Sequence, residues 1–244
     1  MQSSPGTITT VFFDMDETLV EHSRTGLELC QDTFTAHAEH LDGVEMERFI
    51  KTLWQKANDM WNMMFDGVLS GEVARIYAFK NTLRTLEADD SLAESMQETF
   101  ESLMLESTHL TDGAMDVLET LRVKEYTLGM ITNGYTAMQS RKITHHGLDK
   151  IMDHVFISEA MGAHKPDSRI FTSALEQAHA SPDQAVHVGD NLRADIAGAI
   201  GAGLSGLLFD PKGARTKKLA DDASLTKPTH IVQSLTEVAA WVGV

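Results

Sequence analysis

The sequence predicts an α/β fold: a doubly wound parallel sheet with helices on both faces and a helical domain inserted after the first strand. Two observations support this prediction. From about residue 114 onward, short β-branched and aromatic runs alternate with helical stretches, which is typical of parallel sheets. Between residues 21 and 107, by contrast, strand signals vanish and helical spacing takes over. The 244 residues are enough for one large domain and one smaller domain.

The predicted sheet begins with the run Ile8–Phe13, which ends abruptly in acidic residues. Further strands are predicted at Tyr126–Ile131, His154–Ile157, Val186–Val188, Gly206–Phe209 and His230–Val232. Helices are predicted at Ala114–Arg122, Tyr135–His146, Pro166–Ala178, Ala194–Ala202 and Leu235–Trp241. The polar stretch Pro211–Lys227 is interpreted as a surface loop or a short helix. Residues 1–20 and 108–244 are therefore expected to form the α/β core, and residues 21–107 an α-helical cap.

The predicted cap shows an apolar stripe at helical spacing. Its members step by four and three along the chain, as helix packing requires: Ile50, Trp54, Ala57, Trp61 and Met64. Core packing is preferred here to a cofactor site. Gly67, Ser70 and Gly71 predict a break between two helices. Arg75, Lys80 and Arg84 are candidate substrate contacts, although pairing with neighbouring acidic residues is the favoured interpretation.

Composition excludes several classes of function. The net charge of −16 argues against a nucleic-acid polymer as partner, because such binding needs a concentrated positive surface. No run is long enough to span a bilayer, and no basic targeting segment is present, so no membrane partner is expected. The single cysteine, Cys30, allows no intrachain disulfide and suits a reducing cytoplasm, where the protein is expected. The sequence does not distinguish a monomer from a homodimer.

Polar residues follow each of four predicted strands. Ligands bind beyond the carboxyl ends of parallel strands, so these residues are expected to meet in one crevice. The clusters are Asp14 and Asp16; Thr132-Asn133-Gly134; Lys165 in the loop after Ser158-Glu159; and Asp190 with Asp195 one helical turn later. Each alone could be an ordinary turn, helix cap or solvated lysine. The four together, each in a strand-end position, indicate a site.

The predicted crevice combines carboxylates with a lysine and a threonine. Clustered carboxylates repel one another unless a cation lies among them, and oxygen ligands suit Mg²⁺. A lysine and a threonine beside that cation form an anion site. The combination predicts phosphoryl transfer, in which positioning and charge neutralisation supply most of the catalysis.

The four clusters resemble the motifs of the haloacid dehalogenase superfamily of aspartyl-phosphate enzymes. Residues 14–19, Asp-Met-Asp-Glu-Thr-Leu, resemble its first motif, and Thr132-Asn133 the second. Lys165 resembles the third, and residues 189–195 the fourth. The helical insertion resembles the family's first class of cap. The resemblance covers the chain in order and implies a Rossmann-like core, and the Thr-Asn-Gly and Lys-Pro-Asp runs are similar to those of nucleotide and sugar-phosphate phosphatases.

The resemblance implies a role for each residue. Asp14 would be the nucleophile and Asp16 the general acid and base. Thr132, Asn133 and Lys165 would bind the phosphoryl group. Asp14, Asp190 and the backbone carbonyl of Asp16 would bind Mg²⁺, while Asp195 would orient these ligands.

A Mg²⁺-dependent phosphatase acting on a small phosphorylated metabolite is therefore the expected enzyme. Asp16 weighs against a dehalogenase, because the family's dehalogenases lack an acid at this position and use no Mg²⁺. A sugar-phosphate mutase stays open, since its core residues would be the same. A non-catalytic binding protein is disfavoured, because it would gain little from a nucleophile with its acid. The physiological substrate depends on the geometry of the cap, which the sequence does not give.

Overall fold

The computed structural model describes residues 7–244, so residues 1–6 of the predicted core lie outside it. The chain divides into two compact units. Unit 1 contains the described residues up to Glu21, together with His109–Gly134 and Ile143–Val244. Unit 2 contains His22–Thr108 and also Tyr135–Lys142, a segment that the sequence analysis assigns to the core.

Unit 1 is built on a six-stranded sheet in which every neighbouring pair is parallel. Its strands are β1 (Thr10–Phe13), β4 (Thr127–Thr132), β5 (His154–Ile157), β6 (Ala185–Gly189), β7 (Ser205–Phe209) and β8 (His230–Val232). The order β5-β4-β1-β6-β7-β8 places β1 in the interior, between two strands that come much later in the chain. The prediction of a doubly wound parallel sheet is confirmed.

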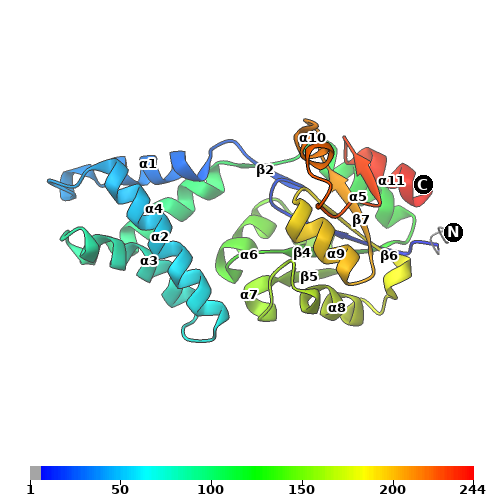
Figure 1. The fold of residues 1–244 in the computed structure, drawn as a ribbon, viewed down its shortest axis with the longest axis horizontal. Helices are drawn as coiled ribbons and strands as arrows, with labels where there is room; N and C mark the ends of the chain where they lie inside the picture. Colours follow the sequence, from blue (N-terminus) through cyan, green and yellow to red (C-terminus); the bar gives the residue numbers. More distant parts are fainter. Residues whose placement is uncertain (1–6) are drawn as a thin grey trace. The chain divides into compact units, whose positions relative to one another are not determined.

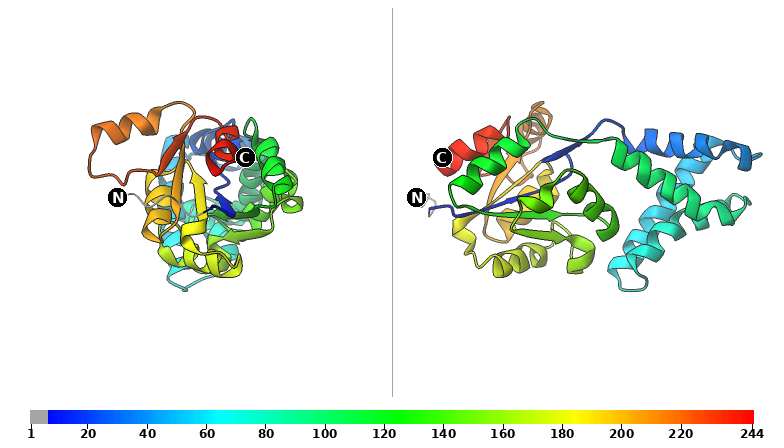
Figure 2. Two further views of the ribbon diagram at one scale, coloured as in Figure 1. Left: turned by 90° about the vertical axis from the view of Figure 1, so that its right-hand side faces the viewer. Right: turned by 180° about the vertical axis from the view of Figure 1, so that it is seen from behind.

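Alternate residues of β1 enter different cores, because successive side chains of a strand point to opposite faces. Val11 and Phe13 pack with helices α5 (Ala114–Val123) and α11 (Thr236–Val242) on one face. Phe12 packs on the other face, with α8 (Ser168–Gln177) and α9 (Gly198–Gly201). Figures 1 and 2 show these helix pairs on opposite sides of the sheet.

Two features differ from the predicted elements. The predicted helix Ala194–Ala202 begins instead as a π-helical turn, Leu192–Ala197, which continues into α9. Asn191 caps this turn by accepting hydrogen bonds from the backbone N–H groups of Arg193 and Ala194. The short strands β2 (Val20–His22) and β3 (Thr108–Leu110) pair with each other and were not predicted. Part of the stretch Pro211–Lys227 forms α10 (Ala214–Asp221), which agrees with the short helix that was one of its two predicted alternatives.

Unit 2 is helical. It contains α1 (Gly26–Ala36), α2 (Met46–Phe65), α3 (Gly71–Thr85), α4 (Ala93–Glu106) and the beginning of α6 (Thr136–His145). Its core includes Phe49, Phe79, Leu83 and Met96, all nearly inaccessible to solvent. The predicted break between two helices is confirmed, since α2 ends at Phe65 and Ser70 caps α3.

The predicted apolar stripe of α2 is only partly buried. Ile50 and Met64 belong to the core, but Trp54 is 52% exposed and lies against Gly26. Of the three basic candidates, Arg84 pairs with Asp90 as the favoured interpretation expects. Arg75 pairs with Glu101, but this pair is largely buried, and Lys80 Nζ lies 5.8 Å from the centroid of the Tyr77 ring.

The remaining short elements are the helix α7 (Ser158–Met161) and four 3₁₀ turns at Ala38–His40, Asp90–Leu92, Leu148–Lys150 and Pro182–Gln184. Within residues 7–244, none of the helices combines the length and the apolar character that crossing a membrane would require.

Candidate active site

Asp14 lies directly beyond the carboxyl end of the interior strand β1. Its backbone N–H donates to the Val188 carbonyl at 2.8 Å, so the hydrogen bonds between β1 and β6 extend to this residue. The side-chain Oδ1 accepts a hydrogen bond from the backbone N–H of the next residue, Met15, at 2.7 Å. Only 8% of Asp14 is exposed, and Oδ2 has no hydrogen-bond partner within residues 7–244. Oδ2 is therefore available to a ligand.

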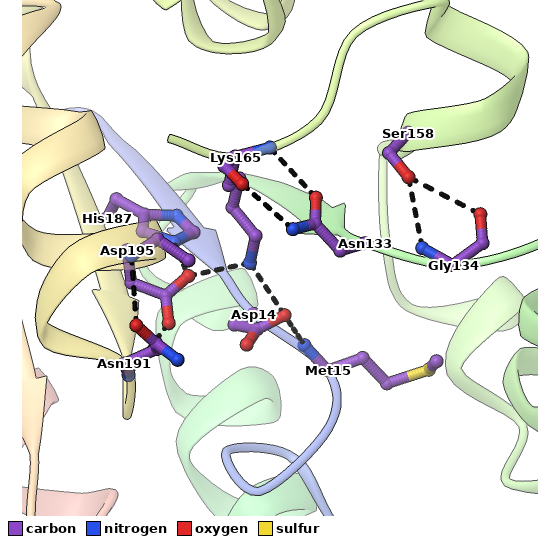
Figure 3. Close-up of polar contacts among 10 residues, drawn as sticks. Asp14, Met15, Asn133, Gly134, Ser158, Lys165, His187, Asn191 and Asp195 are labelled. Atoms are coloured by element: carbon purple, nitrogen blue, oxygen red, sulfur yellow. Dashed lines mark hydrogen bonds and ion pairs between the residues drawn. The ribbon is translucent and has the colours of Figure 1, made fainter. Parts of the chain in front are cut away.

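Lys165 joins the two most buried carboxylates of the site. Its Nζ lies 2.8 Å from Asp14 Oδ1 and 2.6 Å from Asp195 Oδ1 (Figure 3). Only 2% of the lysine side chain is exposed. Since a buried ammonium is costly without a partner, the two carboxylates are what stabilise it in this position.

Asn133 fixes the loop that carries Lys165. Its Nδ2 donates to the Lys165 carbonyl at 3.0 Å, and its Oδ1 accepts from the Lys165 N–H at 2.8 Å. The adjacent Gly134 N–H donates to Ser158 Oγ at 3.0 Å, which joins the ends of β4 and β5 (Figure 3). The Asn133 side chain thus orients the lysine backbone, a role that the sequence analysis did not assign to it.

Asp195 is held by three groups. Oδ1 accepts from Lys165 and lies 3.0 Å from His187 Nε2, while Oδ2 accepts from the Asn191 N–H at 2.9 Å. His187 comes from the middle of β6 and is completely buried. This histidine was not among the predicted site residues. The only available signal was a polar residue within an otherwise apolar strand, which more often indicates packing than function.

Burial and neighbouring charges drive the pKa values of these groups in different directions. Burial, reinforced by Asp195, raises the pKa of Asp14 well above its usual range. Burial alone would raise the pKa of Asp195 too, but Lys165 and His187 outweigh it and the pKa is lowered. For Lys165, burial opposes the charge, yet Asp14 and Asp195 together raise the pKa. Burial lowers the pKa of His187, which favours a neutral imidazole.

Asp190 follows β6 and is contacted by an arginine that the sequence analysis did not single out. Arg215 binds the Asp190 carboxylate through Nη2, and its Nε donates to the Asp190 carbonyl at 3.1 Å. Burial, reinforced by Asp195, raises the pKa of Asp190 to about 6 despite this arginine.

The helix that carries Arg215 is itself attached to the sheet. Asp210, a buried residue directly after β7, accepts through Oδ2 from the Thr216 N–H and Oγ1, both at 2.7 Å. These bonds fix the first turn of α10, which carries Arg215. No regular pattern in the stretch around Arg215 distinguished it from solvated basic residues.

Three carboxylates form a cluster that could hold a cation. Asp14, Asp190 and Asp195 each offer an oxygen, and these atoms all lie within 4.8 Å of one another. The set consists of oxygens alone, which fits a hard cation such as Mg²⁺ rather than a transition metal.

The geometry brings together the predicted residues Asp14, Lys165, Asp190 and Asp195. Asp16 is half-buried in the turn after β1, and its side chain does not belong to the cluster; Thr132 is buried at the end of β4.

Comparisons with known proteins identify the family of this chain. The family model of haloacid dehalogenase-like hydrolases matches residues 8–203. The chain belongs to this family. The predicted resemblance and the predicted type of enzyme, a hydrolase, are thereby confirmed.

Two relatives and one solved structure illustrate the similarity. The pyrimidine 5'-nucleotidase YjjG of Escherichia coli is 33% identical over 80% of this chain and 83% of its own length. The ribulose-1,5-bisphosphate 5-phosphatase of Halopiger xanaduensis is 34% identical over 63% of this chain and 64% of its own length. The 2-haloacid dehalogenase of Pseudomonas syringae pv. Tomato DC3000 superposes with a TM-score of 0.73 at 26% identity, covering 96% and 97% of the two chains. The two relatives act on small phosphorylated metabolites.

Proposed function

We propose that this protein is a Mg²⁺-dependent phosphatase that hydrolyses a small phosphate monoester through an aspartyl-phosphate intermediate. The observation that supports this best is Lys165, whose ammonium lies within 2.8 Å of Asp14 while Asp190 stands in the same carboxylate cluster. A buried lysine beside an available carboxylate oxygen makes a site in which a phosphoryl group is bound and attacked. The phosphatases among the relatives support the same reaction class.

The first half-reaction would transfer the phosphoryl group to Asp14. A carboxylate oxygen forms a bond to phosphorus as the bond from phosphorus to the leaving oxygen breaks. Asp16 gives its proton to that oxygen, so a neutral alcohol departs. Lys165, Thr132 and the backbone N–H of Asn133 would bind the phosphoryl oxygens and neutralise their charge.

The second half-reaction would restore the enzyme. Asp16, now ionised, takes a proton from water as the water oxygen bonds to phosphorus. The bond between phosphorus and the Asp14 carboxylate then breaks, and inorganic phosphate leaves. Asp195 takes no part in bond formation, because Lys165, His187 and the Asn191 N–H occupy its oxygens. It would hold Lys165 in place instead.

The carboxylate cluster fits Mg²⁺, which Asp14, Asp190 and the Asp16 carbonyl would hold. When bound, the ion would neutralise the carboxylates and the charge on the phosphoryl oxygens. Arg215, which contacts Asp190, would keep that carboxylate in one orientation.

The test is phosphate release from para-nitrophenyl phosphate and glycerol 3-phosphate, with and without Mg²⁺. We expect Mg²⁺-dependent release that Asp14→Asn abolishes. The matched control is Asp183→Asn, which makes the same change at an exposed position and should leave the rate unchanged. Equal release by Asp14→Asn would refute the nucleophile assignment. Chloride release from 2-chloropropionate would favour a dehalogenase, and isomerisation of a sugar phosphate without free phosphate would favour a mutase.

A further inference from the structure

His187 is a polar residue on an apolar face of the sheet, and the reaction proposed above does not use it. It lies in the middle of β6, in register with Phe12 of β1 and Gly206 of β7. Residues in register share a face of a sheet, so the imidazole points to the same face as Phe12 and is completely buried there. An aliphatic side chain would pack on this face without the cost of burying a polar ring. The histidine therefore indicates a role beyond packing.

Two contacts fix the orientation of the imidazole. The ring of Phe171, a buried residue of α8, packs edge-on against it, with 5.3 Å between the ring centroids and 83° between the ring planes. The ring nitrogen Nε2 lies 3.0 Å from Asp195 Oδ1. Within residues 7–244, this carboxylate is the only hydrogen-bond partner of the His187 side chain.

The carboxylate determines which ring nitrogen carries the hydrogen. Asp195 is ion-paired with Lys165, and an ionised carboxylate can only accept, so Nε2 of His187 must be the donor. Nδ1 is buried without a partner among the described residues, so a hydrogen there would have no acceptor. His187 is therefore a neutral ring that donates from Nε2, and it serves as a fixed hydrogen-bond donor rather than as an acid or a base.

The bond from His187 keeps the Asp195 carboxylate from rotating (Figure 3). The Asn191 N–H binds Oδ2 at 2.9 Å, but a carboxylate held at one oxygen can still turn about its Cβ–Cγ bond. His187 holds the other oxygen, Oδ1, which is also the oxygen that accepts from Lys165 Nζ at 2.6 Å. The place of this ammonium, 2.8 Å from Asp14 Oδ1, thus depends on His187 through Asp195.

We propose that His187 is a positioning residue for phosphoryl transfer: by donating to Asp195 Oδ1, it holds the Lys165 ammonium where the phosphoryl group is bound and attacked. It touches none of the reacting atoms and acts only through Asp195. The inference rests on the proposed function, because the placement of Lys165 matters to the reaction only if a phosphoryl group binds beside Asp14.

Two substitutions separate donation from packing. His187→Gln places an amide N–H where Nε2 lies, and its carbonyl leaves one acceptor unpaired, as Nδ1 does in this structure. His187→Leu suits the apolar face but donates nothing. We expect kcat for para-nitrophenyl phosphate to fall about 10–100-fold in His187→Leu and to stay within about threefold of the wild-type value in His187→Gln. Equal kcat values in the two variants, whether high or low, would overturn the proposal.

Val186→Ala controls for a loss of stability. Val186 precedes His187 on β6, but its buried side chain enters the core on the opposite face of the sheet. This variant should lower the unfolding midpoint and leave kcat per folded molecule unchanged. If kcat fell as far as in His187→Leu, looser packing of β6 would explain both losses and the positioning role would be refuted.

A double-mutant cycle tests whether His187 acts through Asp195. In an Asp195→Ala background the proposed contact is already absent, so adding His187→Leu should lower kcat by less than about twofold. A further loss as large as that in the wild-type background would show that His187 acts by another route.

Two measurements need no turnover. Inorganic phosphate, which Lys165 would bind, should bind several-fold more weakly to His187→Leu than to the wild type or His187→Gln, as measured by calorimetry in the presence of Mg²⁺. Nitrogen NMR of the imidazole rings, with the His187 signals identified by their loss in His187→Gln, should show a hydrogen on Nε2 and none on Nδ1. A hydrogen on Nδ1 would contradict the proposed donor.

The outcomes separate this inference from the proposed function. A wild-type protein that releases no phosphate, yet binds inorganic phosphate in the expected order, would refute the phosphatase and leave His187 as the residue that positions Lys165. Phosphate release by the wild type, with equal kcat in His187→Leu and His187→Gln, would refute the role of His187 alone.

Discussion

Ionisable groups are buried both at the carboxyl ends of the strands in unit 1, called the sheet edge below, and in the interior of unit 2. The two regions differ in whether these groups have charged partners. At the sheet edge, Asp14, Lys165 and Asp195 alternate in sign within hydrogen-bond distance. In unit 2, Cys30 lies in an apolar core, and burial alone raises the pKa of its thiol to about 11. Burial by itself suppresses ionisation, whereas burial beside fixed partners can favour it.

The same contrast appears within the sheet edge itself. Asp14 and Asp195 are both buried, yet the pKa of the first is raised and that of the second is lowered. The difference lies in their contacts. Asp195 has Lys165, His187 and a backbone N–H, while Asp14 Oδ2 has no hydrogen-bond partner among residues 7–244. The carboxylate of Asp195, with both oxygens hydrogen-bonded, is stabilised as an anion. The carboxylate of Asp14 keeps one oxygen to which a ligand can bind.

Removing the shared cation should have the largest effect. Lys165→Met leaves two buried carboxylates unpaired, so we expect a loss of about 3–5 kcal/mol in the free energy of unfolding. Phosphatase activity should also fall, by roughly 10²–10³-fold or more. Chemical unfolding and phosphate release measure the two effects, with the exposed Lys150→Met as control. An unchanged free energy of unfolding would show that the ion pairs of Lys165 do not stabilise this part of the sheet.

The next largest effect concerns the space around Asp195. A Cβ atom at Gly189 would collide with the Asp195 side chain, which three hydrogen bonds prevent from moving. Gly189→Ala should therefore cost about 3 kcal/mol of unfolding free energy, as overpacking does. Gly201→Ala is the matched control, since a Cβ there meets nothing within 4 Å. Equal unfolding midpoints for the two variants would show that the Asp195 side chain can shift to accommodate the added methyl group.

The buried carboxylate of unit 2 should matter less, because Arg141 beside it is 43% exposed. Glu101→Gln keeps the shape but removes the charge between two arginines, and should cost about 1–2 kcal/mol. Glu98→Gln, an exposed change on the same helix, serves as the control. A loss as large as that of Lys165→Met would contradict the contrast between the two regions.

The effect that is smallest at neutral pH comes from Cys30, because it appears only as a pH dependence under alkaline conditions. Burial raises the pKa of its thiol to about 11 in the folded protein, above the ordinary value of 9.0. The folded state therefore holds its proton more tightly, and this contribution to stability is lost as pH rises through 9 towards 11. The slope of unfolding free energy against pH in this window should flatten in Cys30→Ala. An identical slope would place the thiol in contact with solvent.

Much of the sheet and site could be predicted, because strands and their ends carry strong local signals. The runs His154–Ile157 and His230–Val232 match their strands residue for residue. Lys165 and Asp195 could be placed in the crevice because parallel strands deliver the residues that follow them to one edge. Their common contact confirms that they lie together, while the proposed roles stay predictions.

What escaped prediction depends on contacts between distant segments. Arg215 looks like any basic residue of a polar stretch until α10 attaches to Asp210. His187 lies within an apolar strand, so its sequence neighbours do not indicate a functional residue. The strands β2 and β3 have three residues each, and their pairing with each other stabilises them more than local propensity does. Tyr135–Lys142 reads as an ordinary helix beginning, and nothing local indicates that it belongs with unit 2.

The interior position of β1 has a consequence for how the protein is made. Both partners of β1, β4 and β6, are encoded more than a hundred residues later, after the whole of His22–Thr108. During synthesis, the apolar strand β1 therefore stays without its partner strands while the helices of unit 2 emerge. Long-range pairing of this kind is slow and exposes strand edges to other chains. Protecting β1 on the ribosome should therefore govern the yield of active protein.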